Sequence, residues 1–170
     1  MRRGLQSGEL PRVKKMSVIV RTVARMVAGF IFLYGIYVVC YGHLSPGGGF
    51  GGGVVLACSF ILLLLAYGKP YALKVFGYRA AKSFDSFGAL LFLALALMGL
   101  VFSGGVFFLN AIQKTWPGHP LRLLNGGIIP LSNVAIAIKV SASLFLVTVV
   151  LAALRVTARG ADRDFQSQED

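Results

Sequence analysis

The residues from 26 to 68 contain no Asp, Glu, Lys or Arg, and a block of closely spaced glycines interrupts this apolar run near its middle. A helix needs roughly 20 apolar residues to cross the hydrocarbon core of a bilayer. An uncharged run of this length predicts two crossings, and the glycine block GHLSPGGGFGGG lies where the turn between them is expected, over 42–53. The chain is therefore expected to be a membrane protein whose second span begins in glycine.

Further apolar stretches of spanning length follow in the second half of the chain, and the composition agrees with them. The chain is 56% hydrophobic and only 14% charged, which leaves too little polar surface for a soluble domain of 170 residues. We therefore expect an all-α fold, an integral membrane bundle of four transmembrane helices. The expected helices are 22–41, 47–68, 86–109 and 132–155. The corresponding domains are a basic N-terminal extension over 1–21, a four-helix domain over 22–155 and a polar tail over 156–170.

The lysines and arginines are distributed unevenly among the segments that flank these helices. Seven lie at or before Arg25, four lie over 69–82 and three follow the last span, whereas the segment 110–131 has two. Because basic residues accumulate on the cytoplasmic side, we expect a multi-pass protein of the cell membrane with both termini in the cytoplasm. The stretch 69–84 would lie at the cytoplasmic interface, and 110–131 would be an outer loop. This distribution explains the net charge of +11 without a nucleic-acid partner.

Small residues recur every four positions at the start of the second span, a pattern typical of a helix face that packs closely against a neighbouring backbone. Ser45 suits the N-cap of this helix and Pro46 its first turn. A second interpretation stays open, in which the glycines bring backbone groups close to an ion or water path. The string also matches G-x-G-x-x-G, but no strand precedes it, so nucleotide binding is not expected. The residues expected to carry helix packing or a motif are Ser45, Pro46, Gly47, Gly48, Gly49, Phe50, Gly52, Gly53 and, before the last span, Pro130.

Lys139 is the only charged residue in the interior of an expected span, away from the ends where Arg25 and Arg155 lie, and it is about 10 Å below the outer end if its helix begins at Ser132. Its neighbours one turn away, Ala135 and Ser143, are small, which favours a groove that faces a hydrated path or a partner carboxylate. The alternative is a lysine whose long side chain reaches the outer headgroups. Asp85 is the only acidic residue near a span. We interpret it first as a cap or first-turn carboxylate of the third helix and second as an ion-path or partner contact.

Two further polar residues complete the candidates for an ion route. His43 lies at the outer end of the first span, where it is either a hydrogen-bonded structural residue or a proton relay. Asn133 is expected to cap the last helix or to bond across helices rather than to bind sodium. The two cysteines, Cys40 and Cys58, lack the spacing of a metal site, so neither a metal nor a redox cofactor is expected. The ion-route candidates are Lys139, Asp85, His43 and Asn133.

Three stretches of the chain resemble the hallmark segments of one family. They are GHLSPGGGFGGGVVLA at 42–57, FDSFGALLFLALALMGL at 84–100 and GGIIPLSNVAIAIKVSASLFL at 126–146. Together they resemble the B subunit of Mrp-type multisubunit Na+/H+ antiporters, the MnhB-like domain. Gly51 departs from the family pattern, which often has a larger residue at that position.

The resemblance implies an accessory subunit that supports or lines the ion route of a complex that exchanges Na+ and H+. Its partners would be the lipid bilayer and other subunits of an Mrp-type antiporter or of an Mrp-containing respiratory complex, such as a membrane-bound hydrogenase or a sulfur-reducing enzyme. A purely structural assembly subunit is a third interpretation. The sequence has no catalytic nucleophile, metal-ligand cluster or cofactor motif, so enzyme activity is not expected. Apart from Asp85, its acidic residues all lie in the terminal tails, so ion exchange by the chain alone is not expected.

Overall fold

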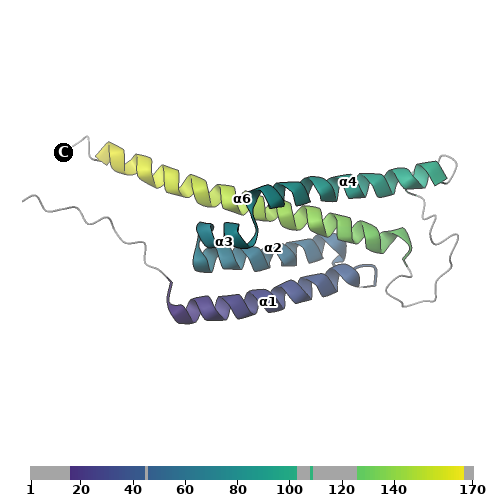
Figure 1. The fold of residues 1–170 in the computed structure, drawn as a ribbon, viewed down its shortest axis with the longest axis horizontal. Helices are drawn as coiled ribbons and strands as arrows, with labels where there is room; N and C mark the ends of the chain where they lie inside the picture. The colour runs from purple at the N-terminus through teal and green to yellow at the C-terminus, as the bar shows by residue number, and fades with distance from the viewer. Residues whose placement is uncertain (1–15, 45, 103–107, 109–125, 167–170) are drawn as a thin grey trace, which may run out of the picture.

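The fold consists of helices throughout the part of the chain that the computed structural model describes, which is residues 16–44, 46–102, 108 and 126–166, with side chains to 152. Four of these helices are long and apolar enough to cross a membrane. The predicted all-α, four-span fold is therefore confirmed. The helices are α1 (Val18–Cys40), α2 (Gly48–Tyr67), α3 (Lys69–Val75), α4 (Tyr78–Phe102) and α6 (Ile128–Gln166) (Figure 1).

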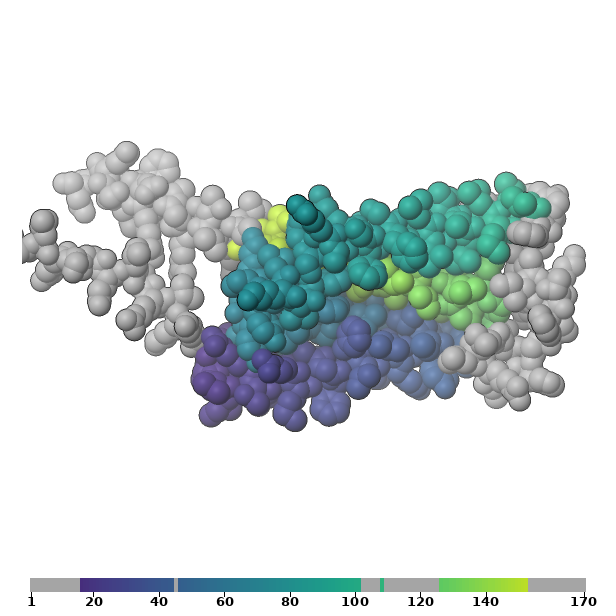
Figure 2. All heavy atoms as spheres, in the orientation of Figure 1, coloured from purple at the N-terminus to yellow at the C-terminus, as the bar shows by residue number. Residues whose placement is uncertain are grey.

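The four long helices lie side by side in the order α1, α2, α6, α4, so that chain order and spatial order differ (Figure 1). In the space-filling view, the green residues of α6 are visible between α4 and the purple-to-blue helices α1 and α2 (Figure 2). Phe145 of α6 is the only large side chain that is fully buried among the described residues. A bundle with so little core of its own leaves most of its apolar side chains facing outward, toward lipid or other proteins.

The first span begins earlier than its uncharged run because a serine caps it. The Ser17 hydroxyl accepts a hydrogen bond of 3.3 Å from the Val20 N–H, and α1 therefore starts at Val18 rather than near residue 22. Two arginines, Arg21 and Arg25, consequently lie on the first turns of the helix rather than before it. The buried face of α1 consists of small or β-branched residues: Ala24, Ala28, Gly35 and Val39.

The last helix is longer than predicted at both ends, since it begins at Ile128 and continues to Gln166. The interpretation of Pro130 as part of the outer loop is therefore wrong. Proline is tolerated in the first turn because the N–H that it lacks would have no partner there. The start at Ile128 moves Lys139 four residues farther from the beginning of its helix than the expected start at Ser132 implied.

The largest difference from the predicted fold lies in the connection between the second and third spans. This connection was expected to be an interfacial stretch over 69–84. The chain turns at Gly68, where φ is +86°, and α3 then runs back along α2. At its end, the Phe76 ring lies 5.0 Å from the Phe60 ring and 5.3 Å from the Phe145 ring. Phe60 precedes the end of α2 by seven residues, so the chain has returned by about 10 Å along that helix. The third span, α4, therefore begins at Tyr78 instead of residue 86.

The glycine block forms the turn and the first turns of α2. Gly47, with φ +137°, occupies the N-cap without a side-chain hydrogen bond, and Gly48 has φ +54°, a conformation that side chains other than glycine rarely adopt. Pro46 lies in the turn before the helix rather than in its first turn, and Ser45 falls outside the described residues. Phe50 points outward with 65% of its surface exposed. The helix start is therefore specified by backbone conformation and not by a polar cap of its own.

The glycines of α2 face both neighbouring helices because α2 lies between them. A Cβ atom added to Gly53 would lie 3.0 Å from Ala137 Cα on α6, and one added to Gly52 would lie 3.0 Å from the Val39 nitrogen on α1. Gly51, the residue that departs from the family pattern, has nothing within 4 Å of such an atom. The close approach of backbones therefore involves Gly49, Gly52 and Gly53, whereas Gly51 has free space beside it.

Candidate functional site between the third and fourth spans

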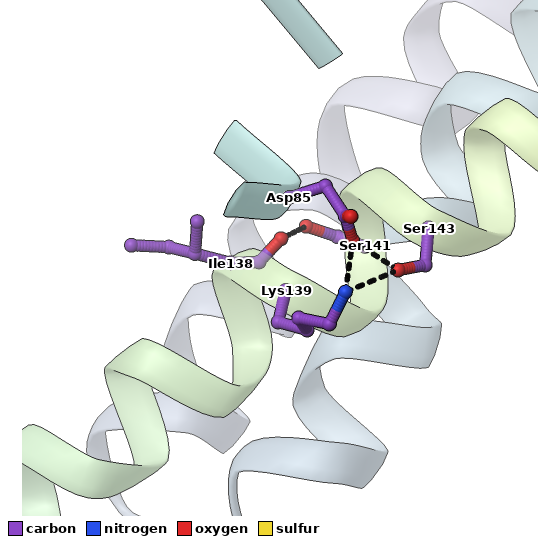
Figure 3. A network of polar contacts seen from close by, with 5 residues as sticks. All are labelled: Asp85, Ile138, Lys139, Ser141 and Ser143. Atoms are coloured by element: carbon purple, nitrogen blue, oxygen red, sulfur yellow. Dashed lines mark hydrogen bonds and ion pairs between the residues drawn. The ribbon is translucent and has the colours of Figure 1, made fainter. Parts of the chain in front are cut away.

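A lysine and an aspartate from two different spans meet where α4 packs against α6 (Figure 3). Lys139 Nζ on α6 lies 2.5 Å from Asp85 Oδ1 on α4, and it also donates to Ser143 Oγ over 3.5 Å. The Ser143 hydroxyl donates to the same Asp85 oxygen. The carboxylate therefore accepts hydrogen bonds from both an ammonium and a hydroxyl group, and the three side chains form a closed triangle.

The two helices are brought together by a glycine one turn from the aspartate. A Cβ atom at Gly88 would lie 2.7 Å from the Lys139 nitrogen and 2.9 Å from the Ala135 carbonyl oxygen. Any larger residue would push the helices apart, so α4 and α6 have their closest approach here. Asp85 precedes Gly88 by three residues and lies on the same face of α4. The glycine thus places the carboxylate within reach of the lysine.

The pair lies well inside the two spans. Lys139 follows the start of α6 by 11 residues, or about 16 Å, and Asp85 follows the start of α4 by seven residues, or about 10 Å. The 11 residues between the helix start and Lys139 replace the seven that a start at Ser132 implied. The Lys139 Nζ points toward Ser143, which lies one turn farther from the Ile128 end of the helix. A lysine that reached the outer headgroups would point the other way, toward Ile128.

The interpretation of Asp85 as a cap or first-turn residue is wrong. Asp85 is the eighth residue of α4, and the first turn of this helix has no acidic residue. The expected start at residue 86 followed the onset of the apolar run, but the helix extends back through Arg79 and Lys82 to Tyr78. Asp85 consequently belongs to the interior of a span, where a charged side chain needs a partner.

The ion pair faces outward from the single chain rather than into its core. The Lys139 side chain is 42% exposed and the Asp85 side chain 28% exposed. Ser141, which Figure 3 places beside them, uses its own hydroxyl to donate to the Ile138 carbonyl at 3.1 Å and does not join the pair. Because bare charge is costly in hydrocarbon, this side of the pair requires contact with water or with another protein.

A second polar contact joins the glycine block to the last helix. The Gly49 N–H donates to Asn133 Oδ1 over 3.2 Å, and Asn133 is only 9% exposed. The first N–H groups of a helix have no partner within it, so a side chain of α6 here supplies the cap that α2 lacks. Asn133 thus bonds across helices. His43, in the turn between α1 and α2, lies beside Gly126, about 20 Å along α6 from Lys139.

We expect Asn133→Ala to destabilise the protein by about 0.5–2 kcal/mol, the usual cost of losing a helix cap. The measurement is the thermal denaturation of the detergent-solubilised protein. Ser132→Ala is the matched control, because the equally buried Ser132 hydroxyl bonds only to the Ile128 carbonyl of its own helix. An equal loss of stability in both variants would contradict the assignment of Asn133 as the cap of α2.

The polar residues of the described region do not form a metal centre. No group of three or more His, Cys, Asp or Glu side chains comes together there. Cys40 and Cys58 are both free thiols on different helices.

Sequence reasoning identified Lys139 and Asp85 separately but not as a pair. Ser143 was noted only for its small size, although its place one turn from Lys139 could have marked it as a hydrogen-bond partner. Gly88, three residues after Asp85, was the signal that another helix approaches the carboxylate closely. The register between α4 and α6, which brings Asp85 and Lys139 together, follows from the close contact of Gly88 with the backbone of α6.

These features define a class, a multi-pass helical membrane protein with an ion pair inside its spans, an arrangement that marks ion and proton pathways. The chain belongs to the family described as the domain related to the MnhB subunit of Na+/H+ antiporter, which matches residues 19–161. The resemblance inferred from the sequence is therefore confirmed.

Relatives of this family include a protein of Staphylococcus aureus named as antiporter subunit mnhB2. It is 33% identical over 104 residues, 61% of this chain and 72% of the relative. An uncharacterised protein of Methanocaldococcus jannaschii is 32% identical over 142 residues, 81% of this chain and 53% of that protein. A chain from the membrane-bound sulfane sulfur reductase, an archaeal respiratory membrane complex, is similar in structure, with a TM-score of 0.67 and 34% identity. That match covers 84% of this chain and 60% of the other. This chain thus spans little more than half the length of two of these relatives.

Proposed function

We propose that this chain is a membrane subunit of an Mrp-type cation/proton antiport module, in which the Asp85–Lys139 pair lines or supports the ion route. The observation that carries the proposal is the position of this pair, inside two spans and open on one side. Membership of the MnhB family supports it, as does the name of the staphylococcal relative as an antiporter subunit. The ions moved by the complex would be Na+ and H+.

The arrangement of the pair suits a component of a transporter better than a transporter on its own. A hard cation such as Na+ takes oxygen ligands, and Asp85 with Ser143 offers three side-chain oxygens. Lys139 already neutralises the carboxylate, so a cation would have to displace its ammonium group. Between residues 10 and 161 the sequence has no other acidic residue, and further oxygen ligands would have to come from partner subunits.

A second candidate host is the membrane arm of a respiratory complex. The similarity to a chain of the sulfane sulfur reductase favours it, because the fold and 34% of the matched residues are shared. In this host the redox chemistry would belong to other subunits, and this chain would retain its role beside the ion route. A purely structural role would also leave the chain in a complex but would give the ion pair no part in transport.

We further propose that both termini lie in the cytoplasm. The two terminal segments and the stretch 69–82 together hold 14 basic residues, whereas the segment 110–131 holds two. This is the asymmetry that the positive-inside rule describes. Labelling with a membrane-impermeant thiol reagent tests this orientation in intact cells, after removal of the two native cysteines. A cysteine at Met16 should stay unlabelled and one at Leu44, at the opposite end of α1, should be labelled.

Isolation of the intact complex through a tag on this chain tests the proposed function and its host together. We expect co-purification of the other subunits of an antiport module, with or without the subunits of a redox enzyme. Membrane vesicles that contain the complex should show sodium-dependent proton movement, and vesicles from cells without this chain should not. A chain that purifies alone and leaves sodium-dependent proton movement unchanged when it is deleted would refute the proposal.

A further inference from the structure

Two arginines and two tyrosines form a cluster where α1 begins and α2 ends. The Tyr67 and Tyr71 rings stack with their centres 4.3 Å apart. The Arg25 guanidinium lies 5.3 Å from the Tyr67 ring centre and 6.0 Å from that of Tyr71, and the Arg21 guanidinium lies 5.8 Å from Tyr67. The Tyr67 hydroxyl donates to the Arg21 carbonyl over 2.8 Å. We call these four residues the arginine–tyrosine cluster.

The cluster holds two positive charges that no carboxylate neutralises among the side chains that the structure describes. The single acidic residue between positions 10 and 161 is Asp85, which forms an ion pair with Lys139. Arg25 donates one long hydrogen bond of 3.4 Å to the Tyr71 hydroxyl. The Nε of Arg21 is buried and has no hydrogen-bond partner among the described residues. Guanidinium groups have five N–H donors each, so the donors that remain for an anion are those of the terminal nitrogens and of the Arg25 Nε, whereas the buried Arg21 Nε is not accessible to one.

The cluster lies at the depth of lipid headgroups. Arg25 and Tyr41 bound the uncharged part of α1, and Tyr41 lies 16 positions after Arg25, which corresponds to about 24 Å of helix. This length is about 6 Å less than the thickness of the hydrocarbon core, a distance that the long Arg25 side chain can span to reach the headgroups, where Arg and Tyr side chains are favoured. On the faces that carry the cluster, Val18, one turn before Arg21 on α1, is 78% exposed, and Val75, one turn after Tyr71 on α3, is 48% exposed, so apolar side chains flank the cluster on the outside of the bundle.

We propose that the arginine–tyrosine cluster binds the phosphodiester headgroup of an anionic phospholipid. Arginine presents parallel N–H groups that match two phosphate oxygens, and the stacked tyrosine rings hold both guanidinium groups in place before a ligand arrives. The exposed apolar residues beside the cluster would contact the acyl chains. These apolar neighbours and the depth of the site favour a lipid over an acidic segment of a partner protein, which would bring no acyl chain.

The test is native mass spectrometry of the intact complex, released from bilayers that contain equal amounts of phosphatidylglycerol and phosphatidylcholine. The wild-type complex should retain phosphatidylglycerol in preference. The variant Arg21→Gln/Arg25→Gln should lower this preference by roughly 10- to 30-fold. The control Arg79→Gln/Lys82→Gln removes the same charge from exposed residues of α4 and should retain the preference. An equal loss in both variants would overturn the proposal, because it would indicate general attraction by basic residues.

Two further arms keep the result interpretable. If the glutamine variant does not assemble, which the same spectra reveal, Arg21→Lys/Arg25→Lys retains the charge but not the planar guanidinium groups. It should still lower the preference severalfold, and full retention would overturn the proposed geometry. Millimolar inorganic phosphate should not displace the retained lipid. Displacement by phosphate, or a wild-type complex without preferred phosphatidylglycerol, would overturn the assignment to a lipid.

Discussion

Lys139→Met should reduce sodium-dependent proton movement by the complex by at least about tenfold and should also weaken assembly. The substitution leaves Asp85 without its ammonium partner inside a span, and the cost lies below the figure of about 3–5 kcal/mol for breaking a fully buried ion pair because both side chains are partly exposed. The paired variant Lys139→Met/Asp85→Asn removes both charges, which is close to neutral for stability in many proteins. We expect this variant to restore assembly without restoring transport. The measurements are the yield of intact complex and the initial rate of proton movement in vesicles.

The comparison of these two variants separates a transport role from a structural one. If the paired variant regains both assembly and the wild-type rate, the pair serves only to hold α4 against α6 and the proposed ion route is wrong. Ser141→Ala is a suitable control, since its hydroxyl bonds to the Ile138 carbonyl and not to the pair. It should change neither quantity.

Gly49→Ala should destabilise the bundle strongly, whereas Gly51→Ala should not. A Cβ atom at Gly49 would overlap the backbone of Asn133, and a backbone moves away at higher cost than a flexible side chain. Overpacking of this kind costs about 1–3 kcal/mol and sometimes more. At Gly51 nothing lies within 4 Å, and alanine is the better helix former by about 1 kcal/mol. The measurement is the thermal denaturation of the two variants, which carry the same substitution two residues apart. The midpoint should fall for Gly49→Ala and should not fall for Gly51→Ala.

The same substitution at these two positions also tests how α2 lies in the bundle. Equal stability of the two variants would mean that Gly49 does not face α6, and the arrangement of α2 between α1 and α6 would then be incorrect. A destabilised Gly51→Ala variant with a stable Gly49→Ala variant would indicate that α2 is rotated about its axis.

The four spans could be predicted because apolar runs of sufficient length report membrane crossing directly. The fold-back before the third span could not, because it depends on contacts of Phe76 with Phe60 and Phe145, residues distant in sequence. That fold-back precedes the start of α4 at Tyr78, whereas the close contact of Gly88 with α6 sets the register that pairs Asp85 with Lys139. The sequence thus indicated which residues are unusual, while the tertiary packing determined which of them meet.

The hydrogen bond between Gly49 and Asn133 joins residues 84 positions apart and therefore has a consequence for biogenesis. At the usual speed of translation, roughly 4 to 17 s pass between the synthesis of these two residues. During this interval the Gly49 N–H at the beginning of α2 lacks its acceptor, the side-chain oxygen of Asn133, although α1 is already present. Nascent chains that stop before the last span would keep a bare glycine backbone in the bilayer. Quality-control proteases could recognise such chains as incomplete.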